Sequence, residues 1–448
     1  MSARLIDSLA TTPALADVFS DDAVLRAMLE FESKLALAQA RLKIIPRTAA
    51  RTIAACAMPS KFDIPALAAA TFRAGTPAIP LVKALTSLVR KADAEAARFV
   101  HWGATSQDVA DTAMSLLLKN AEPILVADLV RLEKALVSLS NRHKDTVMLG
   151  RTLLQAAPPI TFGLKAAGWL VPIHHGKHRL ESAFRDAVVL QFGGASGTLA
   201  SLGKAGAAVA KELGRELGLK TSAAWHTRRD NLATLICACG VLTASLGKMA
   251  RDISLLMQNE VGEAAEPGND GRGGSSTMPN KRNPTACALT LAAAHRLPGL
   301  VASFLSAMVQ EHERGVGGWH AEWPIITSVV QSTGVAIASM AEVAEGLSVD
   351  TKKIRANIKS TNGLIFAERA TMMLGAKLGR DVAYEILEAA ARESVSSGKN
   401  LAAVLSGIPE VTAHLSPAEL KQLEIPNQYL GSAEAFRKAL LAESATKN

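Results

Sequence analysis

The stretch SQDVADTAMSLLLKNAEPILVADLVRLEKALVSLSNRHK, residues 106–144, begins a part of the chain that consists of long helical segments. Apolar residues recur in it at helical spacing, and further segments of the same kind follow. They span residues 159–190, 225–263, 284–312 and 322–346. At 1.5 Å per residue such a segment is roughly 40 Å long, which is more than one small domain can cover. The sequence therefore predicts a central bundle of five long helices.

Shorter helices are predicted on both sides of this bundle. Residues 22–43 carry apolar positions at helical spacing and end before Pro46, and prolines and glycines then interrupt the chain up to about residue 100. Similar breaks recur after residue 347. Aromatic residues make up only 4% of the chain, which favours helices over sheets, and very little strand is expected. We predict an all-α protein with three helical domains, residues 1–104, 105–346 and 347–448.

Composition excludes several classes of protein. With 448 residues and 49% hydrophobic content the chain is globular rather than disordered or fibrous. Its four cysteines lack the paired spacing of a zinc site or a disulfide framework. The N-terminus has no apolar signal region, so a cytoplasmic location is expected. The apolar stretch 231–249 contains Thr, Ser and Lys and is interpreted as a buried helix rather than a membrane span.

Charge and surface composition limit the partners. The formal net charge is +8, but Lys and Arg are scattered among acidic residues and few aromatic residues are available to stack on bases. Neither nucleic acid nor a membrane is expected as a partner. A positive field would instead help to collect a small polyanionic substrate. The outward faces of the long segments remain rich in Ala, Leu and Val, which predicts a homo-oligomer.

The segment PGNDGRGGSSTMPNKRNP, residues 267–284, interrupts the helical chain with glycines and prolines. Loops of this kind close over substrates and bring reactive groups into place. A serine hydroxyl such as that of Ser275 can act as a base only if positive charge and backbone donors stabilise its alkoxide. Lys281 is placed to supply that charge. The alternative is a solvated linker between helices.

A second candidate segment is HWGATSQDVADTA, residues 101–113, which places Thr105 and Ser106 at the start of the first long helix. Either residue could be a simple N-cap. The free N–H groups and the dipole of a helix N-terminus also make an anion site. In that interpretation His101 forms a hydrogen bond with the substrate and is not a core histidine.

These segments resemble motifs of the fumarase/aspartase superfamily. GGSSTMPNKRNP is similar to its signature GSSxMPxKxNP, and HWGATSQD to its carboxylate-binding HxGxTSxD segment. GRTLLQAAPPITFG, residues 150–163, resembles RTHLQPAxPxTFG of the adenylosuccinate lyases. The resemblance implies that Ser275 is the catalytic base and that Lys281 binds a carboxylate and stabilises a carbanion. It assigns substrate binding to His101, Thr105, Ser106, Gln155, Ser276 and Asn283. It further implies a homotetramer with active sites shared between subunits.

Two departures from the superfamily pattern predict the type of reaction. Eliminating members carry a histidine two residues after the RT, held by a glutamate early in the helix after the signature, but here these positions are Leu153 and Ala288. Expelling an amine or hydroxide requires a proton donor. A substrate carboxylate that closes a ring is already ionised, because its pKa is about 4. We therefore expect the cycloisomerase branch, which closes a carboxylated muconate to a lactone. The alternatives are a fumarate-releasing lyase of the adenylosuccinate lyase type and a non-catalytic relative.

Three further segments leave alternatives open. EHERGVGGWHAEW, residues 311–323, resembles cycloisomerase sequence and offers Arg314 as a catalytic cation, although it could also be the charged end of the fourth long helix. The glycines of QFGGASGTLASLG, residues 191–203, lack a phosphate-binding pattern and are interpreted as close helix packing. The histidines at 174, 175 and 178 have no suitably spaced companion ligand and are interpreted as solvent or interface residues. No metal and no organic cofactor are expected.

Overall fold

The computed structural model describes residues 5–268 and 273–445, so residues 269–272 of the predicted catalytic loop 267–284 lie outside the described part. By their internal contacts the residues form two compact units. Unit 1 contains Met1–Val130, His175–Gly247 and Leu289–Ser339, and unit 2 contains Arg131–His174, Lys248–Ala288 and Met340–Asn448. The division into three domains stays a prediction.

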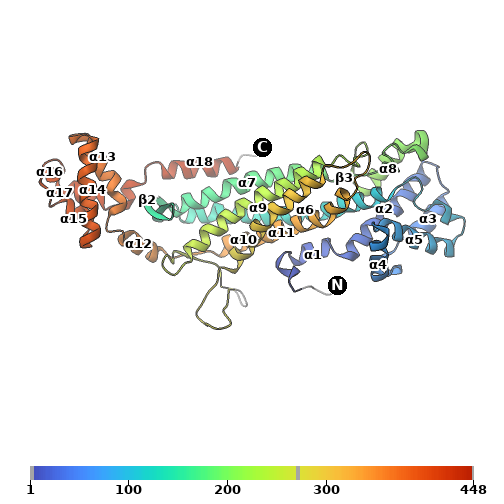
Figure 1. Ribbon diagram of the computed structural model, residues 1–448, viewed down its shortest axis with the longest axis horizontal. Coiled ribbons are helices and arrows are strands. Elements are labelled where there is room, and N and C mark those ends of the chain that lie inside the picture. Colours follow the sequence, from blue (N-terminus) through green and yellow to red (C-terminus); the bar gives the residue numbers. More distant parts are fainter. Residues whose placement is uncertain (1–4, 269–272, 446–448) are drawn as a thin grey trace. The chain divides into compact units, whose positions relative to one another are not determined.

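The long helices are present, and the all-α class is confirmed (Figure 1). They are α6 Ser106–Arg142, α7 Phe162–Ala187, α9 Asp230–Leu256, α10 Thr285–Ala307 and α11 Gly318–Gly346. The second was expected to begin at residue 159, but the chain is extended up to Thr161. Pro158 and Pro159 explain this difference, because proline favours extended neighbours and lacks the N–H group that a helix interior needs.

Shorter helices make up the rest of both units. Those of unit 1 are α1 Pro13–Val18, α2 Asp21–Arg41, α3 Arg47–Cys56, α4 Ile64–Ala74, α5 Ala78–Ala92 and α8 Gly206–Leu217. Those of unit 2 are α12 Thr351–Lys359, α13 Ala367–Leu378, α14 Arg380–Ser397, α15 Leu401–Leu405, α16 Pro409–Thr412, α17 Pro417–Leu423 and α18 Ala433–Ala445. Short 3-10 helices occur at η1 Asp7–Leu9, η2 Pro59–Lys61, η3 Ala96–Phe99, η4 Ala200–Ala205, η5 Leu364–Phe366 and η6 Pro426–Tyr429.

Strand is scarce in the described residues, as expected, but one hairpin was not predicted. In unit 2, β1 Val147–Thr152 pairs antiparallel with β2 Gln155–Thr161. Leu153 and Leu154 form the two-residue turn at φ of 50° and 66°. Such turns usually contain Asn or Gly, so no turn signal is visible at these two positions of the sequence. The remaining pairs are two residues long: β3 Val189–Leu190 with β4 Lys220–Thr221 in unit 1, and β5 Ala264–Ala265 with β6 Ser348–Val349 in unit 2.

Helix α2 is the central element of the N-terminal part of unit 1. Ser20 caps it by accepting a hydrogen bond from the N–H of Ala23 at 3.1 Å. Its apolar face, including Phe31 and Leu35, packs in one core with residues of α5, α6 and α8. The last residues before α6 also lie against α2, because Gln39 Nε2 donates to the carbonyl of Trp102 at 2.7 Å. This packing fixes the start of α6, where several candidate site residues lie.

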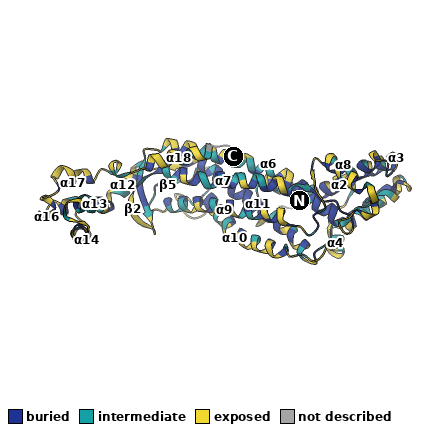
Figure 2. Ribbon diagram, turned by 90° about the horizontal axis from the view of Figure 1, so that it is seen from above, coloured by how far each residue is buried: buried dark blue, intermediate teal, exposed yellow. Residues whose placement is uncertain are grey.

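By length and apolar composition alone, three helices among the described residues could cross a membrane. They are α9, α10 and α11. Within the protein, 61% of the most apolar window of α9 is buried and 72% of that of α11, as expected for core helices. Only 22% of the corresponding window of α10 is buried, and Figure 2 shows exposed residues along this helix. The helix α10 therefore leaves an apolar face uncovered in the single chain.

Candidate active site

The predicted site residues belong to both units. Those of unit 1 are His101, Thr105, Ser106 and Arg314. Those of unit 2 are Gln155, Ser275, Ser276, Lys281 and Asn283.

The start of α6 is organised by Asp108, a fully buried carboxylate that was not singled out from the sequence. Asp108 accepts a hydrogen bond from the N–H of Thr105 at 3.0 Å. It also accepts from the side chain of Gln191 at 3.0 Å and from the N–H groups of Gly193 and Gly194 at 2.8 and 2.9 Å. Four donors satisfy the buried charge, as burial requires. Asp108 thus ties the first turn of α6 to the segment that follows β3.

Gly193, Gly194 and Gly197 of that segment lie in a loop and not within packed helices, which corrects the interpretation from the sequence, whereas Gly203 belongs to η4. A Cβ atom on Gly193 would come within 2.9 Å of the imidazole of His226. Gly194 adopts φ of 68°, which glycine tolerates without steric cost. The glycines therefore allow the loop to approach α6 and His226 closely.

Arg314 lies in the connection between α10 and α11, since α10 ends at Ala307, and it is therefore not the charged end of a long helix. Its Nε donates to Gln107 Oε1 at 3.1 Å, and its Nη2 donates to Thr105 Oγ1 at 3.1 Å and to the carbonyl of Ala195 at 3.2 Å. These acceptors are all uncharged. Among the described residues no carboxylate pairs with Arg314. Its positive charge is thus held in place and remains available to an anion.

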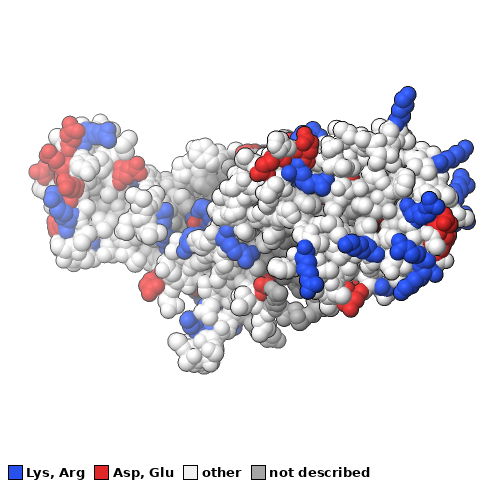
Figure 3. Space-filling model, turned by 45° about the vertical axis from the view of Figure 1, so that its right-hand side comes forward, with Lys and Arg blue, Asp and Glu red and all other residues white. Residues whose placement is uncertain are grey.

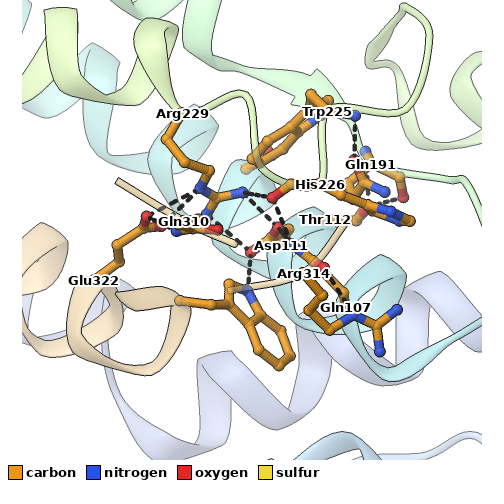
Figure 4. A network of polar contacts seen from close by, with 12 residues as sticks. Gln107, Asp111, Thr112, Gln191, Trp225, His226, Arg229, Gln310, Arg314 and Glu322 are labelled. Carbon is orange, nitrogen blue, oxygen red and sulfur yellow. Dashed lines mark hydrogen bonds and ion pairs between the residues drawn. The ribbon is translucent and has the colours of Figure 1, made fainter. Parts of the chain in front are cut away.

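Unlike Arg314, Arg229 in the same region is paired with carboxylates (Figure 4). Its Nη1 donates to Asp111 at 2.7 Å and its Nε donates to Glu322 at 2.9 Å. All three side chains are at least 98% buried. Burial raises the pKa of Glu322 to about 7, although Arg229 beside it acts to lower that pKa. Two carboxylates neutralise Arg229, so its role is to hold α6 and α11 together.

The Arg229 network also anchors the connection that carries Arg314 (Figure 4). Gln310 Nε2 donates to Glu322 at 2.7 Å. Gln107, which accepts from Arg314, donates in turn to Asp111 at 3.1 Å. Hydrogen bonds therefore link the buried ion pairs through Gln107 to Arg314, and they restrict the position of the Arg314 guanidinium.

Replacing Arg229 by methionine is expected to lower the free energy of unfolding by about 3–5 kcal/mol, because two buried carboxylates lose their partner. Chemical unfolding followed by circular dichroism at one fixed protein concentration measures this loss. Arg131 is the matched control, since its ion pair with Glu345 is 48% and 42% exposed. Arg131→Met should change stability by less than about 1 kcal/mol. Equal effects of the two substitutions would contradict a stabilising role of the buried network.

His101 lies in the turn that precedes α6, and its Nδ1 is 2.6 Å from Glu32 Oε1 on α2. The imidazole is 19% exposed. Burial alone would lower the pKa of His101, but Glu32 and, more weakly, Asp108 raise it by more, so the net shift is upward. His101 is therefore protonated over a wider pH range than an ordinary histidine. Glu32 was missed from the sequence.

In unit 2 the described part of the signature loop folds around Ser275. The Ser275 Oγ accepts from the N–H groups of Met278 at 3.0 Å and Thr277 at 3.3 Å. These backbone donors are of the kind that stabilises a serine alkoxide. Asn283 closes the base of the loop, since its Nδ2 donates to the carbonyl of Gly274 at 3.2 Å. Ser276 and Lys281 are exposed to solvent in the single chain.

The two positions at which eliminating members carry their proton-transfer pair are apolar and exposed. Leu153 at the hairpin turn is 97% exposed, and Gln155 faces Thr152 across that turn. Arg151 fixes the hairpin through two hydrogen bonds to the buried Glu263, at 2.9 and 2.6 Å. Ala288 is in the first turn of α10, and its methyl side chain cannot transfer a proton.

Two histidines of α7, His174 and His178, have carboxylate neighbours that were not singled out from the sequence. In unit 2, His174 is 6% exposed and its Nδ1 is 2.8 Å from Glu133 Oε1, so it is not a solvent histidine. In unit 1, His178 lies 3.6 Å from Glu181. Glu133 is on α6, 41 positions away, which explains why local spacing did not indicate it. Within the described residues no group of three His, Cys, Asp or Glu could hold a metal ion.

Comparison with known proteins identifies the class. The pattern of the lyase family matches residues 9–299, and that of the adenylosuccinate lyase C-terminus matches residues 363–440. The chain belongs to the lyase family, and the predicted fumarase/aspartase superfamily is thereby confirmed.

Individual relatives are similar over almost the whole chain. A 3-carboxy-cis,cis-muconate cycloisomerase of Bradyrhizobium diazoefficiens is 47% identical, covering 98% of this chain and 97% of the relative. One of Pseudomonas aeruginosa is 45% identical, covering 98% and 96%. The crystal structure of the 3-carboxy-cis,cis-muconate lactonizing enzyme from Pseudomonas putida superposes with a TM-score of 0.92 at 42% identity, covering 99% of both chains.

Proposed function

We propose that this enzyme closes 3-carboxy-cis,cis-muconate to 4-carboxymuconolactone, a reaction of the protocatechuate branch of aromatic-acid catabolism. The observation that carries the proposal is the apolar pair Leu153 and Ala288 in a chain that keeps its anion-binding and serine motifs. The relatives named for this reaction support it. A fumarate-releasing lyase would need a proton donor for its leaving group, and these two positions offer none.

The chemistry needs no base to activate the nucleophile. A substrate carboxylate oxygen bonds to a carbon of the double bond, and the electron pair moves to the neighbouring carbon, where an adjacent carboxylate stabilises the charge. That carbon then takes up one proton. Because all three substrate carboxylates are ionised at neutral pH, each turnover consumes one proton from solvent. The protein has to bind the carboxylates, stabilise the carbanion and deliver that proton.

The candidate residues divide these tasks among themselves. Arg314, with Thr105 and Ser106 at the start of α6, binds a substrate carboxylate. Ser275, with its two backbone donors, and Lys281 stabilise the carbanion and deliver the proton to it. The remaining predicted binding residues contribute hydrogen bonds. They are His101, Gln155, Ser276 and Asn283.

The surface charge of unit 1 supports a polyanionic substrate. Residues 41–98 carry exposed cations well in excess of acidic residues, and Figure 3 shows Lys and Arg over the part of the molecule with the N-terminal helices. The cations are Arg41, Lys43, Arg47, Arg51, Lys61, Arg73, Lys83, Arg90, Lys91 and Arg98. The acidic residues of the same range are Asp63, Asp93 and Glu95. A tricarboxylate would be attracted by this field at low ionic strength.

The enzyme is proposed to act as a cytoplasmic homotetramer, with active sites that combine residues of neighbouring subunits. The uncovered face of α10 supports this assembly, because most of its exposed residues are small and apolar or weakly polar over several turns. They include Ala288, Ala292, Gly299, Ala302 and Ser306. Sedimentation equilibrium should give the mass of a tetramer, and a monomer in solution would contradict the assembly.

The proposed reaction is tested by offering purified enzyme 3-carboxy-cis,cis-muconate and, separately, succinyl adducts such as adenylosuccinate. Loss of the muconate absorbance without release of fumarate is expected. Fumarate released from a succinyl adduct, with the muconate left unchanged, would establish the lyase alternative. No reaction with either substrate class would indicate a non-catalytic relative.

A further inference from the structure

Two buried side chains of α2 hold the turn that precedes α6. Glu32 contacts His101 Nδ1 at 2.6 Å, and Gln39 donates to the carbonyl of Trp102 at 2.7 Å. Glu32 and Gln39 are seven positions apart, which places them two turns apart on one face of the helix. Both are at most 1% exposed. A buried face of α2 thus directs two polar residues at this turn.

The backbone of the turn is left-handed at His101, with φ of 60°. Histidine adopts this region more readily than most residues other than glycine. The contacts from α2 hold the turn in this conformation.

His101 is the group in direct contact with Glu32 that can compensate its charge. Its Oε1 faces His101, whereas its Oε2 is buried without a hydrogen-bond partner in the described part of the chain. A buried carboxylate is costly unless a positive charge compensates it. An ionised carboxylate only accepts hydrogen bonds, so Nδ1 of His101 must be the donor. The second ring nitrogen, Nε2, is then a donor only if the imidazole is protonated.

We propose that Glu32 is a positioning residue that keeps His101 as an imidazolium, and that the Nε2–H of His101 binds the substrate carboxylate on which charge collects during ring closure. This inference rests on the proposed function for the identity of the substrate. A neutral His101 with its proton on Nδ1 would present a lone pair to the carboxylate and repel it. The pair therefore converts a weak hydrogen-bond acceptor into a charged donor.

The charged groups that act on His101 are Glu32 from α2 and Asp108 from α6, and both raise its pKa against the effect of burial. Asp108 already accepts hydrogen bonds from four N–H donors. The direct contact of the His101 ring is with Glu32. The active form exists below the raised pKa of His101 and is lost as the pH rises through it. The wild-type kcat/KM should accordingly fall on the alkaline side at a pH above about 6.5.

Glu32→Gln tests the proposal, because it keeps the size of the side chain and removes its charge. The alkaline limb of kcat/KM should move to lower pH. For each pH unit of this movement, kcat/KM should fall about tenfold at about pH 8 but change little at about pH 5.5. NMR of enzyme labelled with 13C at histidine Cε1 should show the same displacement in the titration of His101. Its resonance is identified by its absence in His101→Asn. Glu32→Asp, which keeps the charge, should restore part of the wild-type profile.

Glu212→Gln is the matched control, since Glu212 pairs with Arg41 and Arg215 at the surface of the same unit. It should leave both the pH profile and the titration of His101 unchanged. A wild-type His101 that titrates at or below about pH 6.5 overturns the proposal, and this measurement stands even if Glu32→Gln does not fold. Unchanged titration in a folded Glu32→Gln overturns it equally. A raised His101 pKa in an enzyme that closes no muconate overturns the proposed function instead.

Discussion

Ser275→Ala is expected to reduce kcat by about 10²- to 10³-fold while the helical circular dichroism stays unchanged. The Ser275 Oγ accepts hydrogen bonds from the N–H groups of Met278 and Thr277, which stabilise negative charge on that oxygen. Removing the oxygen removes the group that we propose to exchange a proton with carbon. Substrate binding by the cations is retained, so KM should change much less than kcat.

Steady-state kinetics at saturating muconate measure the effect of Ser275→Ala. Ser397→Ala is a suitable control, because Ser397 is exposed at the end of α14, where its hydroxyl donates to the carbonyl of Glu393. It should behave like the wild type. Turnover of Ser275→Ala within a few-fold of the wild type would remove Ser275 from the mechanism.

Arg314→Met is expected to lower kcat/KM by about 10²-fold or more, with a rise in KM. The Arg314 guanidinium is held by Gln107, Thr105 and the carbonyl of Ala195, and none of these acceptors neutralises it. The loss of an uncompensated cation should therefore weaken the binding of the tricarboxylate directly. Arg314→Lys keeps the charge without the planar fork and should recover part of the loss.

The matched control for Arg314 is Arg215→Met. Arg215 is an exposed arginine of the same unit that pairs with Glu212 and Glu216. Its loss should leave kcat/KM unchanged at moderate ionic strength. If Arg314→Met and Arg215→Met have equal kinetics, Arg314 does not bind the substrate.

The long helices could be predicted from the sequence because apolar periodicity is a local signal. The hairpin β1–β2 could not, since Leu153 and Leu154 occupy turn positions that usually hold Asn or Gly. Nothing local in the sequence marks these two leucines as a turn. The start of α7 also differs from the prediction, because Pro158 and Pro159 keep the chain extended.

Only those residues of the candidate site that lie in the quoted motif segments were predicted from the sequence. Thr105 and Arg314 were named from separate segments, and the structure brings their side chains together. Glu32 was not singled out, because its partner His101 lies 69 positions away in sequence. Asp108 lies within the segment HWGATSQD, but its contacts with Gln191, Gly193 and Gly194 span 83 to 86 positions and were not foreseen. Pairings at such distances depend on the tertiary fold and leave no local pattern.

The structure does contain a histidine–carboxylate pair, and its position matters for the proposed reaction. Glu32 belongs to α2 and His101 to the turn before α6, whereas the vacated positions of the eliminating members are Leu153 and Ala288. The pair is therefore not a substitute at the same positions of the chain. In our proposal it binds a carboxylate and does not protonate a leaving group.

In the proposed reaction the substrate's own carboxylate is the nucleophile, and the origin of the atoms in the product tests this directly. The reaction is run in D₂O enriched in ¹⁸O, and the lactone is analysed by mass spectrometry. We predict one carbon-bound deuterium and no ¹⁸O, because the ring oxygen comes from the substrate and only the proton comes from solvent. Incorporation of ¹⁸O, or release of fumarate in place of a lactone, would contradict attack by the substrate carboxylate.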